Sequence, residues 1–303
     1  MAAIIVTYNP DPNALERGLA SIAPQVDLIV VVDNASHNLC SNRVKSLANA
    51  LGAEMSFISL SNNIGVAAGF NIGAREAQSR GYSFITLFDQ DSIPQENMIQ
   101  KLELSYKMLC NKDPRVAAVG PRYMDPENGK LSSFARFGEF GIKQVVCGSP
   151  SGIVKADFLI SSGSYISMRA LSEVGDMEEA LFIDQVDTEW CLRARSKGWS
   201  VYGVCDAIMS HSLGDSRRRF WFLRWRYFAC HASFRYYYIF RNTLIMIRRD
   251  YVHLNCKMAL FLHIAKLAVY MVIVDTERKE NLRTIQRGIL DGMRGKGGQM
   301  PKD

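Results

Sequence analysis

The sequence has no closely spaced pair of cysteines, although it contains seven of them. A C-x-x-C pair is typical of a zinc ribbon or a dithiol redox site, so neither class is indicated. Because the cysteines are odd in number and scattered, we expect reduced, mostly buried thiols, as in a cytoplasmic protein. No basic stretch precedes the first apolar run at residue 2, and a secretory signal peptide is therefore not expected.

Negative charge is scarce in the last third of the chain. Residues 211–303 carry 18 Lys or Arg and 7 Asp or Glu, a balance of +11, whereas residues 1–210 have a balance of −5. This asymmetry favours an acidic body suited to a metal ion, followed by a basic segment suited to an anionic surface. Arginines alternate with aromatic residues there, as in nucleic-acid-binding segments, but the acidic first part argues against nucleic acid as a partner.

The first 90 residues alternate between strand and helix patterns. The predicted strands are apolar throughout rather than alternating, which is typical of a parallel sheet covered on both faces. Such sheets bind ligands at the carboxyl ends of their strands. The predicted strands cover residues 2–8, 26–34, 54–60 and 82–89, and the predicted helices cover 11–22, 38–51 and 65–81.

The remainder of the chain is less regular. Residues 115–123 and 199–212 predict strands, 155–168 predicts a strand broken at Gly163, and 184–199 contains a short helix. Residues 125–150 are rich in turn-forming residues and predict a loop. We expect a catalytic or binding domain over 1–214 and a helical, basic and aromatic extension over 215–303.

Two carboxylates, Asp89 and Asp91, follow the predicted strand at 82–89 with one residue between them. Oxygen ligands at this spacing suit a hard divalent cation such as Mg²⁺ or Mn²⁺. A D-x-D pair alone is a weak signal, because a turn with two solvated acids has the same pattern.

Other polar residues fall at the same edge of the predicted sheet. Asp33 ends the second strand, where a carboxylate could accept hydrogen bonds from a nucleobase or cap the next helix. Residues 62–73 place Gly65, Gly69 and Gly73 at intervals of four near a helix start. These glycines could let phosphate approach the helix amides or could serve tight helix–sheet packing. The pattern is neither a P-loop nor a G-x-G-x-x-G motif.

A second acidic group lies at 184–189, at the start of the predicted short helix. Asp187 or its neighbour Glu189 could act as a general base toward a sugar hydroxyl, or could cap the helix. His211, after the last predicted strand, could be a third metal ligand, although a lone histidine more often has a structural role.

Taken in order, "VTYN", "VVDNAS", "NNIGVAAGFNIG", "DQD" and "VDTEWCLRARSKGW" resemble the family-2 inverting glycosyltransferases of GT-A fold. The resemblance covers residues 2–245 and is strongest to bacterial rhamnosyltransferases that use dTDP-L-rhamnose in O-antigen or cell-wall polysaccharide assembly. It implies an α/β fold with a mostly parallel, Rossmann-like sheet and an inverting, metal-dependent transfer.

The resemblance also implies a role for each matching position. Asp187 would deprotonate the acceptor hydroxyl, with Glu189 as its supporting neighbour. Asp91 and His211 would bind the metal, with Asp89 near both metal and ribose, while the neutral Gln90 replaces an acid found in some relatives. Trp190 and Gly163 would lie on the acceptor side. Donor-nucleotide contacts are implied for Thr7, Asp33, Asn63, Gly65, Gly69, Asn71 and Asp89.

Acceptors of such enzymes are polyprenyl-diphosphate-linked glycans at the cytoplasmic face of the membrane. We therefore expect a peripheral position there, with the arginines of 217–226 and an interfacial helix over 256–275 meeting the lipid. His263 and Lys266 argue against a membrane-spanning helix at 256–275. Packing of the extension on the catalytic domain, or in a homo-oligomer, is the alternative. A UDP-hexose donor and a non-catalytic nucleotide-sugar-binding protein are the competing functions.

Overall fold

The structure is a computed structural model that describes residues 1–39, 41–126, 129–138, 141–149, 151–210, 216–222, 224–230, 232–273 and 278–301; for 216–222 and 224–230 it describes the backbone alone. Its centre is a nine-stranded sheet in the order β3-β2-β1-β4-β10-β6-β11-β5, with β9 paired to β11. The strands of this sheet are β1 (Ala2–Thr7), β2 (Leu28–Asp33), β3 (Met55–Ser59), β4 (Phe84–Asp89), β5 (Ile93–Pro94), β6 (Val116–Met124), β9 (Ile153–Ala156), β10 (Tyr165–Ser167) and β11 (Ser200–Ser210).

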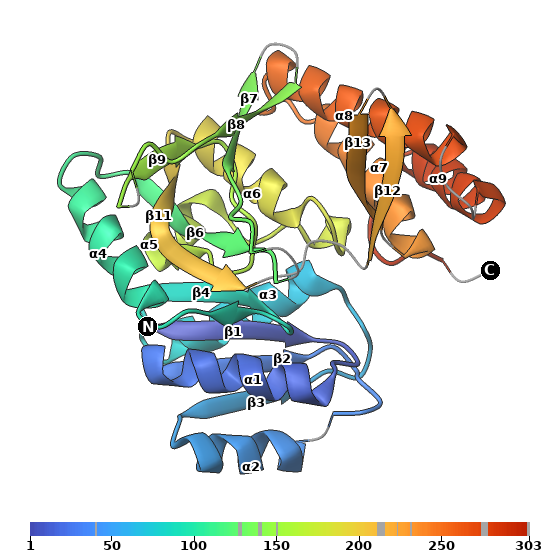
Figure 1. The fold of residues 1–303 in the computed structure, drawn as a ribbon. Helices are drawn as coiled ribbons and strands as arrows, with labels where there is room; N and C mark the ends of the chain where they lie inside the picture. Colours follow the sequence, from blue (N-terminus) through green and yellow to red (C-terminus); the bar gives the residue numbers. More distant parts are fainter. Residues whose placement is uncertain are drawn as a thin grey trace.

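Helices cover both faces of the sheet, as the apolar strands predicted (Figure 1). The α-helices are α1 (Pro12–Ile22), α2 (Ser41–Leu51), α3 (Val66–Ser79), α4 (Met98–Cys110), α5 (Met168–Val174), α6 (Val186–Ser196), α7 (Ser233–Ile247), α8 (Leu254–Ile273) and α9 (Arg278–Met293); two 3-10 turns, η1 (Ala23–Gln25) and η2 (Glu179–Leu181), complete the helical elements. Residues of α1, α2 and α4 pack on one face, and residues of α3, α5 and α6 pack on the other.

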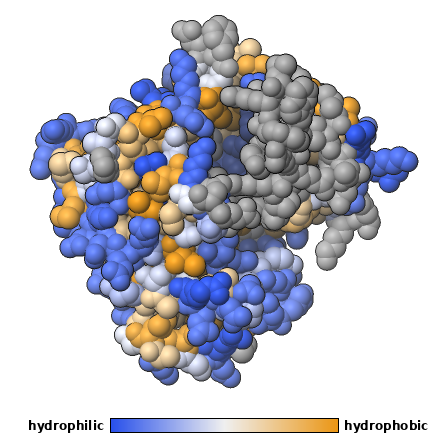
Figure 2. Space-filling view, in the orientation of Figure 1, coloured by the Kyte–Doolittle hydropathy of each residue, from blue (hydrophilic) through white to orange (hydrophobic). Residues whose placement is uncertain are grey.

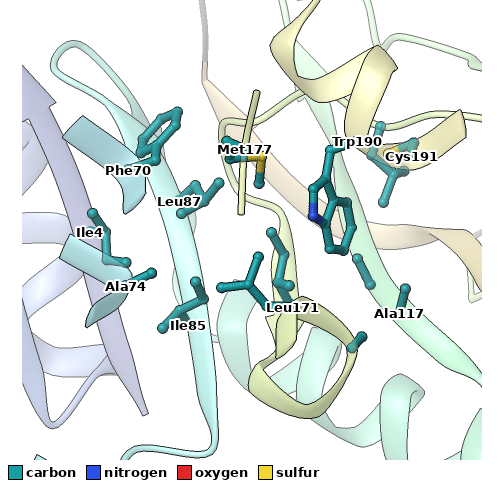
Figure 3. Packing of buried hydrophobic residues seen from close by; sticks show 14 of the residues in the cluster. Ile4, Phe70, Ala74, Ile85, Leu87, Ala117, Leu171, Met177, Trp190 and Cys191 are labelled. Atoms are coloured by element: carbon teal, nitrogen blue, oxygen red, sulfur yellow. The ribbon is translucent and has the colours of Figure 1, made fainter. Parts of the chain in front are cut away.

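Burial on both faces explains the unbroken apolar pattern of β1. Ile4 faces Phe70 and Ala74 of α3, whereas its neighbour Ile5 packs into the opposite cluster with α1. Figure 3 shows the first of these clusters, where side chains of β1 and β4 meet those of α3. On the face seen in Figure 2, hydrophilic residues predominate and hydrophobic ones form smaller patches between them.

Strand direction agrees with the prediction throughout the first half and only in part beyond it, where β6 and β11 pair in parallel but β5, β9 and β10 are antiparallel to their neighbours. β1 pairs in parallel with β2 and β4, and β2 pairs in parallel with β3. β10 then runs antiparallel to both β4 and β6, so the complete sheet is mixed. The carboxyl ends of β1, β2 and β4 therefore share one edge, which carries most of the residues expected to bind the donor.

Two sequence expectations are wrong in the middle of the chain. Part of the predicted loop over 125–150 forms a hairpin of β7 (Phe134–Gly138) and β8 (Gly141–Val145). Cys147 and Cys205 form a disulfide across 58 residues, whereas seven reduced thiols were expected. The two cysteines are far apart in sequence, and only the fold brings their Cα atoms to 6.0 Å.

The C-terminal extension contains a hairpin as well as the expected helices. β12 (Ser216–Phe222) pairs with β13 (Arg224–Cys230), so the arginine-rich stretch is extended rather than helical. Helices α7, α8 and α9 lie together on one side of the molecule, away from α1 and α2 (Figure 1). By length and hydropathy the α8 stretch Leu254–Val272 could cross a membrane, but a buried helix of a soluble protein meets the same criteria.

Candidate active site

The carboxyl ends of β1 and β2 are joined by hydrogen bonds between polar side chains. Thr7 Oγ1 donates to Asp33 Oδ1 at 2.9 Å, and the backbone N–H of Ser36 donates to Asp33 Oδ2 at 3.0 Å. Both Thr7 and Asp33 are buried. Each carboxylate oxygen can accept two hydrogen bonds, so Asp33 Oδ2 keeps acceptor capacity for a base or ribose donor.

The loop before α3 is attached to the same edge. Asn34 is buried, and its Oδ1 accepts a hydrogen bond from the Ile64 N–H at 2.9 Å. Asn63 Oδ1 accepts one from the Gly65 N–H at 3.0 Å. Gly65 adopts φ +91°, a backbone conformation that side chains with a Cβ rarely adopt. The Ile64 hydrogen bond thus attaches the loop of Asn63 and Gly65 to Asn34, the residue that follows Asp33.

The acidic pair lies at the end of β4. Asp89 is its last residue and is partly buried, whereas Asp91 is exposed. Between them, Gln90 Oε1 accepts a hydrogen bond from the Tyr8 N–H at 2.9 Å, which fixes the acidic loop against the end of β1. The neutral Gln90 therefore has a role in holding the loop.

Two consecutive serines connect this acidic loop to Asp187, which lies in the first turn of α6. The Ser161 N–H donates to Asp187 Oδ2 at 3.0 Å. The Ser162 hydroxyl accepts a hydrogen bond from the Asp89 N–H at 3.3 Å. The structure thus brings Asp89 and Asp187, almost 100 residues apart in sequence, to one end of the sheet.

The protein environment raises the pKa of Asp187. Burial is the largest cause, and the nearby charge of Asp89 raises this pKa further, while hydrogen bonds from the Thr188 and Ser161 amides oppose the effect. A carboxylate with a raised pKa is a stronger base than a solvated one and remains ionised above that pKa. A raised pKa of this kind agrees with the general-base role that we expected for Asp187.

Gly69 and Asn71, which we expected to contact the donor, have packing roles in the structure. A Cβ on Gly69 would lie 2.8 Å from Val6 Cγ1, because α3 crosses β1 closely there. Asn71 is buried and forms hydrogen bonds with both the N–H and the carbonyl of Met177 at 2.8 and 2.9 Å. The glycine spacing in this segment reflects helix–sheet packing, the alternative interpretation of the pattern.

Gly163 and Trp190 also differ from expectation. Trp190 is 1% exposed, and its Nε1 donates to the Gly175 carbonyl, so it cannot line an open acceptor site. Figure 3 shows its ring within the apolar cluster, near Ala117 and Leu171. Gly163 adopts φ +81°, and a Cβ there would lie 2.4 Å from Pro121 Cγ. It is needed for the turn that presents Ser161 and Ser162.

Glu189 faces the protein interior rather than the edge of the sheet. It is 1% exposed and accepts hydrogen bonds from Arg193 Nε at 2.8 Å, Arg193 Nη2 at 2.9 Å and the Tyr251 hydroxyl at 2.5 Å. Burial and the adjacent Glu189 carboxylate raise the pKa of Tyr251, which keeps its hydroxyl a donor. Glu189 can therefore support Asp187 only through the position of α6.

The expected metal ligands are described only in part. His211 lies outside the described residues, and within these no group of three or more His, Cys, Asp or Glu side chains is placed to hold a metal ion. The donor set that is described fits a hard cation, because Asp89 and Asp91 are oxygen ligands at one loop. Asp91 is exposed and can reach an incoming ligand.

Sequence reasoning missed Asn34, Ser161 and Ser162. Asn34 directly follows Asp33, and its position could have predicted its role, since a buried amide at a strand end commonly fixes a neighbouring loop. The two serines had no such signal. Their role depends on the antiparallel insertion of β10 beside β4, which the sequence pattern does not reveal.

Comparison with solved structures agrees with this architecture. The crystal structure of S. aureus TarS residues 1–349 superposes with a TM-score of 0.54 at 15% identity, covering 96% of this chain and 80% of that one. A structure of GalNAc-T7 with UDP, GalNAc and Mn²⁺ gives a TM-score of 0.57 at 14% identity; it covers 70% of this chain, which spans 43% of that one. The fold, with its shared strand edge, is that of the GT-A class.

Sequence comparison finds a family match and a relative along nearly the whole chain. Residues 2–149 match the model of glycosyl transferase family 2. Over 297 residues the chain is 28% identical to dTDP-rhamnosyl transferase RfbF of Shigella flexneri, covering 97% of this chain and 95% of that protein. The match to glycosyl transferase family 2 thus covers the first half of the chain, and the resemblance to this dTDP-rhamnosyl transferase extends to nearly the whole length.

Proposed function

We propose that the protein transfers L-rhamnose from dTDP-L-rhamnose to a hydroxyl of a lipid-linked glycan, with inversion, in cell-surface polysaccharide assembly. The observation that carries the transfer chemistry is the Ser161–Ser162 connection, which holds Asp187 beside the acidic loop of β4. The near full-length similarity to a dTDP-rhamnosyl transferase supports the choice of donor.

The proposed mechanism is a single displacement. Asp187 accepts the proton of the acceptor hydroxyl as that oxygen attacks the anomeric carbon from the face opposite the leaving group. The Ser161 and Thr188 amides donate to its two oxygens and so fix the carboxylate plane. Inversion follows from one displacement, and the chain needs no nucleophilic side chain of its own.

Thr7, Asp33, Asn63 and Gly65 would contact the nucleotide in this proposal. Asp89 and Asp91, with His211, would hold Mg²⁺ or Mn²⁺ near the diphosphate. When bound, such an ion neutralises negative charge on the departing nucleoside diphosphate.

We further propose that residues 1–214 form the catalytic domain and that 215–303 bring it to the cytoplasmic face of the membrane. α8 supports this placement, because one of its faces leaves apolar side chains exposed, among them Leu254, Phe261 and Val269. Exposed Lys266 on the same helix suits an anionic lipid surface. Co-sedimentation with anionic but not neutral vesicles is expected, whereas a stable dimer without vesicle binding would assign this face to a second subunit.

A UDP-sugar donor is the second candidate, favoured by one observation: the matched TarS structures include complexes with UDP and UDP-GlcNAc. Asp33 does not separate the two donors, because thymine and uracil present the same imide. The two donors differ in the pyrimidine methyl group, in the ribose 2′-hydroxyl that dTDP lacks and in the transferred sugar.

A thermal-shift panel separates these donors. It compares dTDP, UDP, GDP and ADP, each with Mg²⁺, Mn²⁺ or EDTA, because a ligand that binds the native state raises its apparent stability. We expect the largest, metal-dependent rise with dTDP. A larger rise with UDP would overturn the donor assignment and keep the fold and mechanism. No rise with any nucleotide would favour a non-catalytic assembly protein.

A further inference from the structure

The segment that leads into α6 has an unusual backbone conformation. Phe182 has φ 65° and ψ −63°, and the Ile183 N–H donates to the Leu181 carbonyl at 2.7 Å, which makes a tight γ-turn. Asp184 and Gln185 follow with φ 62° and 65°. Non-glycine residues keep such conformations only where their surroundings fix them, and they often do so at functional sites.

The fixing groups come from α7, more than 50 residues later in the chain. Asn242 is 0% exposed. Its Nδ2 lies 2.9 Å from the carbonyl oxygen of Leu181, 2.7 Å from that of Ile183 and 2.8 Å from that of Asp184. One buried amide therefore satisfies the carbonyls on both sides of the γ-turn.

Arg241, the preceding residue of α7, is also 0% exposed. Its Nη2 donates to the carbonyls of Ala180 at 3.1 Å and Leu181 at 2.9 Å, and its Nε donates to Asn242 Oδ1 at 2.9 Å. The Tyr238 ring lies 4.9 Å from the guanidinium carbon. Carbonyl dipoles and an aromatic face thus stabilise the buried charge, which in turn orients Asn242.

The same segment contacts both sides of the active site. The Phe182 carbonyl accepts the Val66 N–H at 2.8 Å, at the start of α3 and next to the expected donor-binding loop. The Gln185 carbonyl accepts the Glu189 N–H at 2.8 Å, in the first turn of α6 that carries Asp187. Residues 180–185 therefore set the distance between the donor loop and the base.

We propose that Arg241 and Asn242 are positioning residues for the transfer reaction: through residues 180–185 they fix Asp187 relative to the donor-binding loop. The proposal rests on Asp187 being the base of the proposed function. Catalytic groups must be held within about 0.5 Å of their productive geometry, and a displacement of about 1 Å costs on the order of 100-fold in rate.

The test compares Asn242→Ala with a matched control on the same helix. Asn242→Ala removes the side-chain donor of the Ile183 and Asp184 carbonyls, while the Leu181 carbonyl keeps the hydrogen bond from Arg241 Nη2. The control, Tyr237→Phe, removes a buried hydroxyl that donates to Asp291 of α9 at 3.0 Å and keeps the ring that lies 5.2 Å from the Arg241 guanidinium carbon. Rates are measured as dTDP release from dTDP-L-rhamnose, with water as acceptor, and hydrogen exchange is followed in the peptide covering 180–189.

We expect Asn242→Ala to lower kcat by ten- to 100-fold, with the KM for dTDP-L-rhamnose little changed, and to speed exchange in 180–189. Tyr237→Phe should lower the unfolding temperature to a similar degree and leave kcat unchanged. If Asn242→Ala does not fold, Arg241→Lys serves instead, because a lysine cannot donate to several carbonyls in the geometry of the guanidinium fork.

Unchanged kcat in the folded variant, or unchanged exchange in 180–189, would overturn the proposal. Failure of the proposed function gives a different result. If Asp187→Asn retains full turnover, Asp187 is not the base, whereas the exchange measurement in ligand-free protein still reports whether α7 fixes the segment.

Discussion

Replacing Glu189 by glutamine should destabilise the protein far more than its modest chemical change suggests. Glu189 is 1% exposed, and its partner Arg193 has a side chain only 17% exposed. The carboxylate accepts two hydrogen bonds from Arg193 and one from Tyr251. In Glu189→Gln one acceptor oxygen becomes an NH₂ donor that faces other donors, and a buried guanidinium loses its counter-charge. Breaking a buried pair in this way costs about 3 kcal/mol.

The assay is urea unfolding of Glu189→Gln beside Glu103→Gln. Glu103 also forms an ion pair with a basic residue four positions later, Lys107, but the side chain of Glu103 is 44% exposed and that of Lys107 is 66% exposed. The control should lose about 0.5 kcal/mol or less, since exposed pairs of this kind are weak. A loss below about 1 kcal/mol in Glu189→Gln would refute the reasoning and return Glu189 to consideration as a group that acts at the acceptor.

Two further predictions concern the ionisation of Asp187 and the cysteine pair. Because its pKa is raised in the folded protein, ionised Asp187 disfavours the native state, so Asp187→Asn should gain stability relative to wild type, in EDTA, as pH rises from the ordinary carboxyl pKa of about 4 through the higher pKa of folded Asp187; a constant difference in unfolding temperature would contradict this. Peptide mapping of oxidised, denatured protein should find Cys147 and Cys205 in one disulfide peptide and Cys110, Cys191 and Cys256 as free thiols; seven free thiols would contradict the pairing.

Much of the first half of the fold could be predicted from local patterns. β1, β2 and β4 are apolar because helices cover both faces of the sheet. The helical patterns between consecutive strands, which correspond to α1, α2 and α3, could be recognised in the sequence. The antiparallel strand β10 and the hairpin of β7 and β8 could not be predicted, because short strands inside a turn-rich region depend on long-range pairing. The Cys147–Cys205 disulfide could not be predicted either, because it also depends on contacts between segments that are far apart in sequence.

The residues of the candidate site also fall into two groups: those that the sequence pattern predicts and those that only the fold reveals. Asp33, Asp89 and Asp187 could be placed because each ends a strand or begins a helix in a recognisable order. Trp190 and Asn71 were misassigned, since a motif residue can equally serve packing, and burial cannot be read from the motif. The groups that connect the site, Ser161–Ser162 and Arg241–Asn242, act through backbone contacts between distant segments.

The most direct test of the central claim is turnover of dTDP-L-rhamnose by wild-type protein and by Asp187→Asn, measured as dTDP release, with dTDP binding measured in parallel. We predict turnover by the wild type, loss of turnover by at least about 100-fold in the variant, and nearly equal dTDP affinity for both. Equal turnover by the two proteins would contradict the assignment of Asp187 as the base. Tight binding of dTDP without turnover by the wild type would contradict the proposed rhamnosyl transfer itself.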